Sequence, residues 1–373
     1  MTGMGFVGNY LRNLGAIAIG RTPAAPLMFS WYVTHRCGLN CAYCCDGDGK
    51  RFAEERIPEL TTAEARQLID RLAAATDTLD LTGGEPLLRP DLEDLLAHAR
   101  QRGMRTVLNT KGIGLADRPD LWRFTDVLVL SLDTLDPGRL ASLIGRDRAT
   151  AQAVLDGLTC ALAQRGRPLP DEGKGETAVA GPPSLVGLLR RRPGRRARRH
   201  GPLLVLSVVA TPTNLDDLAA VLALAQRERL GFQISPEIVG THPNPALRGH
   251  LGYRALLRRV RAAKAAGAGV LGVEAYLRGI RDFRRFHCHP LLMPVIRPDG
   301  RLYYPCLESK NATVNLLDHR TYGEALAAAR RLTPRRPTCG DCCHIFCHMA
   351  LSLLQRHPLQ AARELRLWRH LDA

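Results

Sequence analysis

Three cysteines near the start of the chain have the spacing of a metal-cluster site. Cys37, Cys41 and Cys44 lie in the segment HRCGLNCAYCC, residues 35–45, and give the pattern C-x3-C-x2-C. Sulfur-rich sites select iron–sulfur clusters, zinc or copper. Three thiolates can hold three irons of a [4Fe–4S] cube, which leaves the fourth iron open to a substrate or cofactor. The adjacent Cys45 is expected to be a bystander.

A second group of cysteines lies near the other end of the chain. Between its first two members, the segment PVIRPDGRLYYPC is predicted to form a β-hairpin that turns at Asp299 and Gly300. Two interpretations stay open: a second iron–sulfur cluster, or a zinc site in which His344 or His348 joins the thiolates. The cysteines of this group are Cys288, Cys306, Cys339, Cys342, Cys343 and Cys347.

Apolar runs alternate with helical patterns over the first two thirds of the chain. Such alternation is typical of parallel β/α units, which curl into a full or partial barrel with its chemistry at the C-terminal strand ends. The fold class is therefore α/β: a partial (β/α)6 TIM-like barrel with a small C-terminal β-hairpin and helix extension. Strands are predicted at 27–34, 78–84, 105–110, 127–133, 203–211 and 232–238, and helices at 61–75, 91–103, 118–124, 150–164 and 214–231.

The pattern divides the chain into three parts. Residues 1–25 form an extension, residues 26–240 the β/α core, and residues 241–373 a C-terminal cysteine-bearing domain. A basic insertion at about 166–202, rich in Gly, Pro and Arg, is expected to be a disordered loop. Cys160 falls inside a predicted helix and is expected to be a small core residue.

Polar segments follow several predicted strands. In LTGGEPLLRPDL, Gly83 and Gly84 allow close approach of a ligand to the backbone, and Glu85 offers a carboxylate to an ammonium group. The segments LNTKG, SLDTLDP and VVATPTN follow the third, fourth and fifth strands. These ends meet at one face of a parallel sheet, so the polar groups are expected to gather beside the first cysteine set.

These motifs together resemble those of the radical S-adenosylmethionine (SAM) superfamily. The match comprises the cysteine triplet after the first strand, the aromatic Tyr43 before its last cysteine, and the GGEP segment. The resemblance implies that the triplet holds a [4Fe–4S] cluster and that Gly83, Gly84 and Glu85 receive SAM. Reductive cleavage of SAM would then produce a 5′-deoxyadenosyl radical that abstracts hydrogen from a substrate.

The resemblance also implies further cofactor contacts. Ser131 and Asp133 correspond to polar residues that hold the ribose hydroxyls, and the segment from Val208 to Asn214 packs near the adenine. Asn109 falls in the position of a T-N-G segment, from which the order Asn-Thr-Lys-Gly departs. An external reductant such as flavodoxin or ferredoxin is the expected partner.

The C-terminal cysteines resemble the twitch and SPASM extensions of the same superfamily. There, a short hairpin and a following helix hold an auxiliary [4Fe–4S] cluster. The twitch pattern assigns Cys288, Cys306, Cys339 and Cys342 as ligands, and leaves Cys343 or Cys347 as a replacement. One auxiliary cluster is expected, because the two-cluster pattern needs seven cysteines and this segment has six.

Composition narrows the class of protein. The 373-residue chain has a formal net charge of +16, which favours acidic partners. The basic run RRRPGRRARR lacks aromatic residues for base stacking, so nucleic-acid binding is disfavoured. No apolar run reaches the length of a membrane span, and no signal peptide is evident, so a cytoplasmic protein is expected. Eleven cysteines in such a protein indicate metal or catalysis rather than disulfides.

Several alternatives for substrate and function stay open. A small molecule, cofactor or lipid is favoured over a peptide, because the N-terminal extension is too short for a leader-binding domain. A peptide maturase with a separate leader-binding partner is one rival, and a non-catalytic zinc-binding interaction protein with a basic nucleic-acid-binding loop is another.

The N-terminal extension is predicted to form a short helix with Phe6, Tyr10, Leu14 and Ile17 on one face. This helix is expected to cover one end of the core, or else to touch a membrane surface or a lipid.

Overall fold

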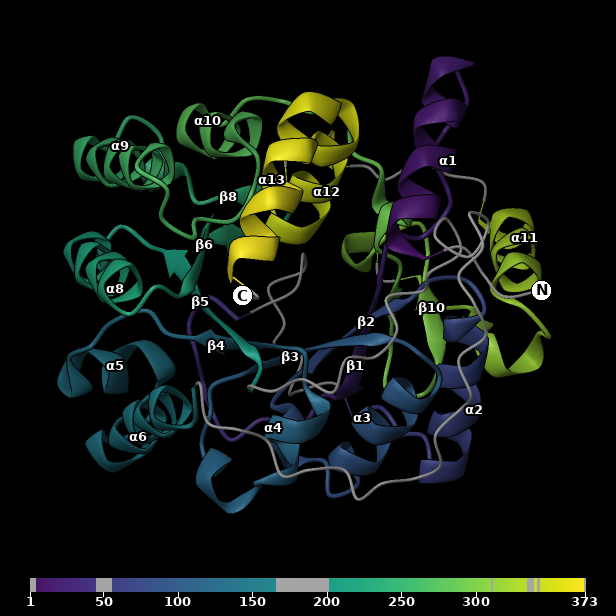
Figure 1. Ribbon diagram of the computed structural model, residues 1–373, viewed down its shortest axis with the longest axis horizontal. Coiled ribbons are helices and arrows are strands. Elements are labelled where there is room, and N and C mark those ends of the chain that lie inside the picture. Colours follow the sequence, from purple (N-terminus) through teal and green to yellow (C-terminus); the bar gives the residue numbers. More distant parts are fainter. Residues whose placement is uncertain are drawn as a thin grey trace, which may run out of the picture.

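The structure is a computed structural model that describes residues 5–44, 56–165, 201–309, 311–333, 339–340 and 343–371. Within these ranges one nine-stranded sheet forms the centre, in the order β11-β10-β9-β1-β2-β3-β4-β5-β6 (Figure 1). Cys45, Cys342 and residues 166–200 of the expected basic insertion lie outside the described residues.

Six consecutive parallel strands make up the core of this sheet. They alternate with helices along the chain, and the sheet order ends at β6 and β11 without closure. The predicted partial (β/α)6 barrel is therefore confirmed. The strands are β1 (Phe29–Thr34), β2 (Thr78–Gly83), β3 (Arg105–Thr110), β4 (Val127–Ser131), β5 (Leu203–Ala210) and β6 (Gly231–Pro236).

Helices surround the curved sheet on its outer side (Figure 1). The first begins at Thr61, whose side chain and that of Glu64 form a reciprocal capping box. One helix, α5, was not predicted from the sequence; Asp136 caps it and Pro137 occupies its first turn. The core helices are α2 (Thr62–Ala73), α3 (Leu92–Gln101), α4 (Asp120–Phe124), α5 (Pro137–Ile144), α6 (Arg148–Gln164), α8 (Leu215–Arg227) and α9 (Leu251–Ala265).

The predicted C-terminal hairpin is present, and it continues the core sheet. β9 (Val295–Ile296) pairs in parallel with β1 and antiparallel with β10 (Arg301–Tyr303), and β10 pairs with β11 (Val314–Asn315). Gly300 takes a φ of 79° in the turn, a conformation that glycine adopts without strain. The sheet of the core and the hairpin of the C-terminal region thus form one structure.

The remaining C-terminal helices lie at both edges of the sheet. α12 (Phe346–Arg356) contacts β6, α10 (Glu274–Asp282) and the N-terminal helix. α11 (Tyr322–Leu332) packs beside β11, and α13 (Pro358–Leu371) follows α12 (Figure 1). A small second sheet pairs β7 (Ile238–Val239) with β8 (His242–Pro243). Segments from the end of the chain therefore flank the barrel at both of its edges.

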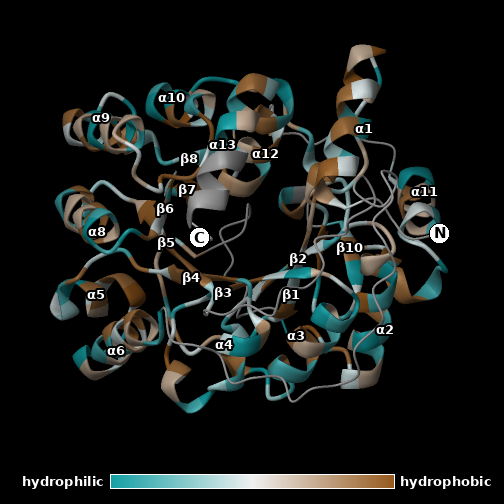
Figure 2. Cartoon of the chain, viewed as in Figure 1, coloured by the Kyte–Doolittle hydropathy of each residue, from teal (hydrophilic) through white to brown (hydrophobic). Residues whose placement is uncertain are grey.

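The N-terminal extension forms the predicted helix, α1 (Phe6–Ala18), which is largely apolar (Figure 2). Tyr10 packs with Leu27 and Leu292, and its hydroxyl donates to the carbonyl oxygen of Leu354 at 3.1 Å. This contact confirms that the helix covers one end of the core. Within the described ranges, none of the helices has the length and apolar character needed to traverse a bilayer.

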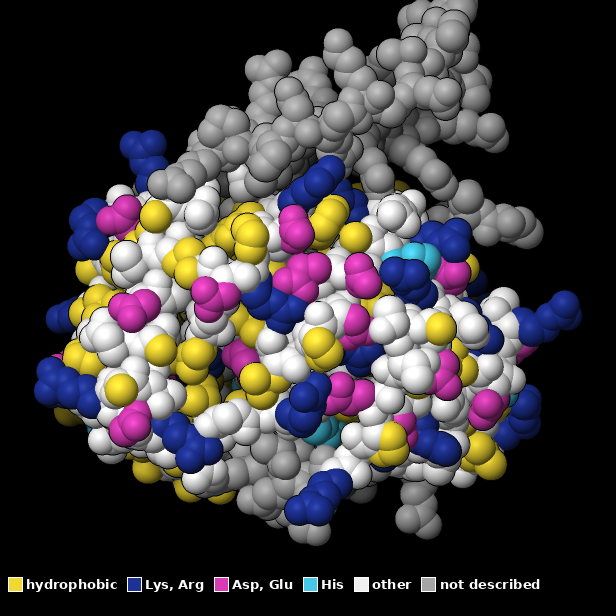
Figure 3. Space-filling model, turned by 90° about the horizontal axis from the view of Figure 1, so that it is seen from below, with side chains coloured by type: hydrophobic (Ala, Val, Ile, Leu, Met, Phe, Trp, Pro, Cys, Tyr) yellow, Lys and Arg dark blue, Asp and Glu magenta, His cyan; other side chains and the backbone are white. Residues whose placement is uncertain are grey.

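The charged residues on one face of the molecule are mixed in sign. On the face drawn in Figure 3, Lys and Arg side chains are interspersed with Asp and Glu. The described residues on that face therefore form no continuous basic track for a nucleic acid backbone.

Candidate active site

The cysteine triplet follows β1 directly, at the C-terminal end of the strand. Cys41 is buried, Cys37 is half-buried and Cys44 is exposed. The Cys44 N–H donates to the Cys41 carbonyl oxygen at 3.1 Å, and the Leu39 N–H points at the Cys37 sulfur at 3.4 Å. Burial raises the pKa of the Cys37 and Cys41 thiols, whereas the nearby cation of Lys111 lowers them. Among the described residues, no three His, Cys, Asp or Glu side chains converge closely enough to hold a metal ion.

The GGE segment packs its backbone against the residues that lead into the triplet. The Gly84 N–H donates to the Thr34 carbonyl oxygen and the Glu85 N–H to that of Arg36, both at 2.8 Å. A Cβ atom on Gly84 would lie 2.2 Å from the Arg36 carbonyl oxygen, a separation that no side chain tolerates. Gly83 has a φ of 141°. Two motifs that lie 39 positions apart in the sequence, from Cys44 to Gly83, are thus held in fixed contact.

Glu85 is held at the junction of two strand ends. Its carboxylate accepts from the Thr110 hydroxyl at 2.6 Å, the Lys111 N–H at 2.9 Å and the Leu87 N–H at 3.1 Å. Burial raises the pKa of Glu85, and these hydrogen bonds oppose the shift. The carboxylate therefore has a single orientation next to the Cys37 loop.

Lys111 is a buried site residue to which the sequence analysis assigned no role. Its ammonium lies 3.0 Å from an Asp133 carboxylate oxygen and 3.3 Å from the Tyr43 hydroxyl. The same Asp133 oxygen accepts from Tyr43, and its other oxygen accepts from the Val209 N–H at 2.8 Å. Burial lowers the pKa of Lys111, but Asp133 and Cys41 raise it further, so the ammonium stays charged. The signal that could have found it is the departure of LNTKG from the T-N-G pattern.

Asp133 and Ser131 lie at the predicted end of β4. Asp133 is buried and engaged by protein partners, whereas Ser131 is partly exposed and stands in register with Ser207 of β5. The Ser207 hydroxyl accepts from the Gln233 side chain at 2.8 Å. Their roles toward a ribose stay predictions.

Asn109 faces an unanticipated acid in the middle of the sheet. Its side-chain amide donates to Asp80 on β2, and the Ser30 hydroxyl of β1 donates to the other Asp80 oxygen at 2.8 Å. Burial raises the pKa of Asp80 to about 6, although both hydrogen bonds oppose this. Asp80 and Ser30 occur inside apolar strands, where the sequence gives little warning of a functional role. A contact between Asn109 and bound SAM stays a prediction.

Part of the second cysteine set is brought together from distant segments. Cys306 follows β10, and Cys339 and Cys343 lie ahead of α12; all three are buried. Burial raises the pKa of Cys343 to about 12, with smaller contributions from Cys339, Glu308 and Cys306. The sequence pattern predicts that Cys339 and Cys342 lie at the start of a helix, whereas α12 begins only at Phe346.

The other members of the set differ in their surroundings. Cys288 is half-buried and packs on the main core. Cys347 lies in the first turn of α12, where burial and then the Asp80 carboxylate raise its pKa to about 12. Tyr32 of β1 lies within electrostatic range of both Cys44 and Cys347, which with burial raise its pKa well above the usual value. One member of each cysteine set therefore lies near the Tyr32 side chain.

The two histidines considered as zinc ligands are both buried. The His344 ring contacts Phe283 and Phe286, and its Nε2 lies 3.0 Å from the Arg284 carbonyl oxygen. Burial lowers the pKa of His348 to about 4, so this imidazole is neutral near pH 7.

A family model matches the part of the chain that carries the first cysteine set. Residues 31–167 match the model of the radical SAM superfamily, and this range contains the triplet, the GGE segment, Lys111 and Asp133. This part of the chain is therefore a radical SAM domain. Since members of this superfamily use a [4Fe–4S] cluster and SAM, the three thiols beside the GGE backbone have a donor set that fits the implied cluster.

Curated relatives share the radical SAM part of the chain. GTP 3′,8-cyclase of Mycobacterium marinum is 38% identical over 139 residues, which cover 35% of this chain and 37% of the relative. PqqA peptide cyclase of Streptomyces rochei is 39% identical over 127 residues, covering 32% of this chain and 33% of the relative. The matched part of the chain thus spans about a third of each relative's length.

A solved structure shares the fold over a longer range. The crystal structure of Streptococcus suis SuiB bound to S-adenosylmethionine superimposes with a TM-score of 0.55 at 14% identity. The superposition covers 84% of this chain and 68% of SuiB. The likeness supports the radical SAM fold class.

Proposed function

We propose that this protein is an enzyme that cleaves SAM reductively at a [4Fe–4S] cluster bound by Cys37, Cys41 and Cys44. The observation that carries the proposal is the pair of backbone hydrogen bonds that joins the triplet loop to Gly84 and Glu85. When bound, the cluster supplies the electron that cleaves SAM. A cosubstrate that touches both the cluster and the GGE segment requires this fixed spacing.

The chain's own residues position the cosubstrate. Glu85 presents a fixed carboxylate to the methionine ammonium group, and the glycines before it let the residues that lead into the triplet lie directly against the GGE backbone. Lys111 places a cation beside Cys41. The site residues assigned from the family resemblance include no such cation. That cation favours anionic thiolates and an anionic carboxylate on a bound ligand.

We further propose that the C-terminal cysteines hold an auxiliary [4Fe–4S] cluster. Cys306 and Cys339 each lie within electrostatic range of Cys343, and the hairpin that precedes Cys306 shares the core sheet. Cys288 and Cys342 remain the other predicted ligands. Zinc is the rival occupant of these thiolates, and the metal content of the protein separates the two.

Anaerobic reconstitution with iron and sulfide tests the radical core. The expected product is a brown protein that absorbs near 400 nm and forms 5′-deoxyadenosine from SAM with dithionite. The Cys37/Cys41/Cys44→Ala variant should form none, whereas Cys160→Ala on α6 serves as the matched control and should be fully active. Cleavage by the triple variant would refute the assignment.

The substrate class has two candidates within this proposal. A small molecule is favoured by the similarity to a GTP cyclase, and a peptide by the similarity to a PqqA peptide cyclase. Fractions of cell extract enriched in small molecules or in peptides can be added to the reconstituted enzyme. The substrate is in the fraction that raises 5′-deoxyadenosine formation above the rate measured without substrate. One component of that fraction should also change in mass during the reaction. A reductant such as flavodoxin or ferredoxin should replace dithionite in the same assay.

A further inference from the structure

A cavity of about 620 Å³ lies at the end of the barrel opposite the cysteine triplet. Pro26, just before β1, and Ala75, just before β2, form part of its wall. Most of the remainder comes from α1 and the segment that follows it on one side, and from α11 on the other. Catalytic groups of parallel barrels gather at the C-terminal strand ends, so the proposed chemistry leaves this cavity unexplained.

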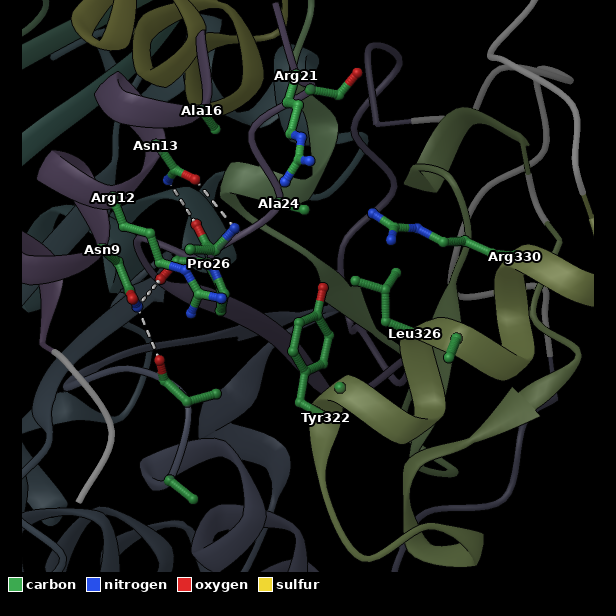
Figure 4. Close-up of a pocket in the computed structure, with 16 residues that line it drawn as sticks. Asn9, Arg12, Asn13, Ala16, Arg21, Ala24, Pro26, Tyr322, Leu326 and Arg330 are labelled. Carbon is green, nitrogen blue, oxygen red and sulfur yellow. Dashed lines mark hydrogen bonds between the residues drawn. The ribbon is translucent and has the colours of Figure 1, made fainter. Parts of the chain in front are cut away.

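The cavity is strongly basic. Arg12 and Arg21 reach it from the N-terminal segment and Arg330 from α11 (Figure 4). Within the described part of the chain, no carboxylate lines the cavity and none pairs with these three guanidinium groups. Three cations held around one hollow repel one another unless an anion lies between them.

Tyr322 supplies a second, independent sign of a ligand. Its side chain is only 6% exposed, and its hydroxyl has no hydrogen-bond partner among the described residues. The ring packs edge-on against Phe29 at 5.0 Å, and Figure 4 shows the hydroxyl directed toward the cavity. Burial raises the pKa of Tyr322, so the hydroxyl remains a neutral donor. A buried hydroxyl without an acceptor is costly, and a bound anion would satisfy it.

The wall of the cavity is held rigidly. The Asn13 side chain donates to the Ala25 carbonyl oxygen at 2.8 Å and accepts from the Ala25 N–H at 3.1 Å. The Asn9 amide donates to the Pro26 and Ala75 carbonyl oxygens, each at 2.8 Å. These contacts fix α1 against the starts of β1 and β2. The apolar part of the lining comes from Ala16, Ala24 and Leu326.

We propose that this cavity binds a phosphate group carried on a small organic body. Guanidinium forks match phosphate oxygens, and three of them with a hydroxyl offer more donors than one carboxylate accepts. The apolar wall suits the uncharged part of the ligand. The source of the phosphate is a soluble ester or a lipid headgroup, since Val7, Leu11 and Ile19 expose an apolar stripe on the same N-terminal segment. This inference does not depend on the proposed radical chemistry.

The direct test titrates glycerol 3-phosphate into the full, iron-loaded chain by calorimetry, at ionic strength matched with chloride. Saturable binding is expected, and Arg21→Ala and Arg330→Ala should each weaken it about tenfold. Arg259→Ala, on the exposed face of α9, is the matched control and should bind as the wild type does. The Cys37/Cys41/Cys44→Ala variant should also bind normally, so failure of the radical assignment would not affect this result.

A second arm separates the two sources of phosphate. The chain is sedimented with phosphatidylcholine vesicles, with and without phosphatidic acid. If a lipid headgroup is the source, the chain should co-sediment with the vesicles that contain phosphatidic acid, and co-sedimentation should require Arg330. Binding in neither arm overturns the proposal, as does binding that the arginine variants leave unchanged.

Tyr322→Phe gives an internal check that does not rest on charge. The variant keeps the ring packed on Phe29 but removes the unpartnered hydroxyl. Its melting temperature without ligand should therefore equal or exceed that of the wild type, while its affinity for the phosphate probe falls several-fold. Unchanged affinity in this variant would show that the hydroxyl takes no part, and would overturn the site as drawn.

Discussion

The two cysteine sets differ in how the fold positions them. The first occupies one loop after β1, held by backbone hydrogen bonds to the GGE segment. The second is assembled from a segment after β10, the residues ahead of α12, and α12 itself. Next to the first set, a Cβ on Gly84 would meet backbone oxygen at 2.2 Å; next to the second, a Cβ on Gly340 would meet only the end of the Arg285 side chain at 3.2 Å.

This difference separates a site built from local backbone from one built by long-range packing. Backbone cannot yield to an added atom without moving a strand, whereas the end of a long side chain can rotate away. Changes beside the first set should therefore abolish function, and comparable changes beside the second should be tolerated in the first step of the reaction.

The largest effect is expected for Gly84→Ala. The new methyl group would overlap the carbonyl oxygens of Arg36 and His35, so the triplet loop and Glu85 must separate. Misplacement of this size should reduce 5′-deoxyadenosine formation by about a hundredfold or more. Turnover of SAM with dithionite, normalised to iron content, measures the loss.

Gly340→Ala is the matched variant at the second set. Gly340 has a φ of 63°, so alanine costs about 1 kcal/mol of backbone strain, but no backbone atom blocks its methyl group. SAM cleavage without substrate should stay near the wild-type rate. A loss equal to that of Gly84→Ala would mean that the two sites are not mechanically distinct.

Iron content sharpens the comparison at the ligands. Wild-type protein should hold about eight irons per chain, as two cubes of four. Cys343 is grouped with Cys306 and Cys339, so Cys343→Ala should retain about four irons and still cleave SAM without substrate. If Cys342 is the ligand instead, the variant keeps all its iron. One zinc per chain in the wild type would refute the auxiliary cluster.

Much of the first site could be predicted because its signals are local. The triplet, the two glycines and Glu85 each form a short motif, and the strands that carry them are continuous apolar runs. Burial on both faces of a parallel sheet produces such runs, which is why the barrel was also predictable. Thr61 as a helix start was readable from its capping box.

The parts that escaped prediction depend on contacts between distant residues. Asp80 and Lys111 are single polar residues whose meaning comes from Ser30, Asn109 and Asp133 on neighbouring strands. Pairing of β9 with β1 joins segments more than 260 residues apart, and no local pattern specifies it. The basic cavity likewise needs α1 and α11 to be brought together before its charge becomes visible.

Two largely buried lysines, each paired with a carboxylate, allow the first site to be compared with a region outside both cysteine sets. Lys111 pairs with Asp133 in the first site, and Lys264 pairs with Glu364 at 2.8 Å between α9 and α13. Removing one member of a buried pair leaves an uncompensated charge, so Lys111→Met and Lys264→Met should each cost roughly 3 kcal/mol of unfolding free energy. Only Lys111→Met should also weaken SAM binding, measured by equilibrium dialysis.

The double variant Lys111→Met/Asp133→Asn separates charge from position. Removing both charges should recover part of the stability lost in Lys111→Met but none of the SAM affinity. Equal effects of Lys111→Met and Lys264→Met on SAM binding would show that Lys111 acts only through stability.

The smallest expected effect concerns Asp80, a buried acid of β2 within electrostatic range of Cys347. Its pKa in the folded protein is raised to about 6 by burial, above the 3.8 of a free aspartate. The folded state therefore holds more protons than the unfolded state between these values, and stability falls as pH rises through that window. Between pH 5 and pH 7, the wild type should lose about 1 kcal/mol of unfolding free energy relative to Asp80→Asn.

Urea unfolding of both proteins under anaerobic conditions, at several pH values, measures this difference. The comparison with Asp80→Asn cancels the titration of other groups, because only the residue at position 80 differs. Above about pH 7 the two curves should run parallel, since Asp80 is then ionised in both states. If the wild type instead gains stability relative to Asp80→Asn as pH rises, the folded protein favours the Asp80 carboxylate. In that case the Ser30 and Asn109 hydrogen bonds would outweigh burial.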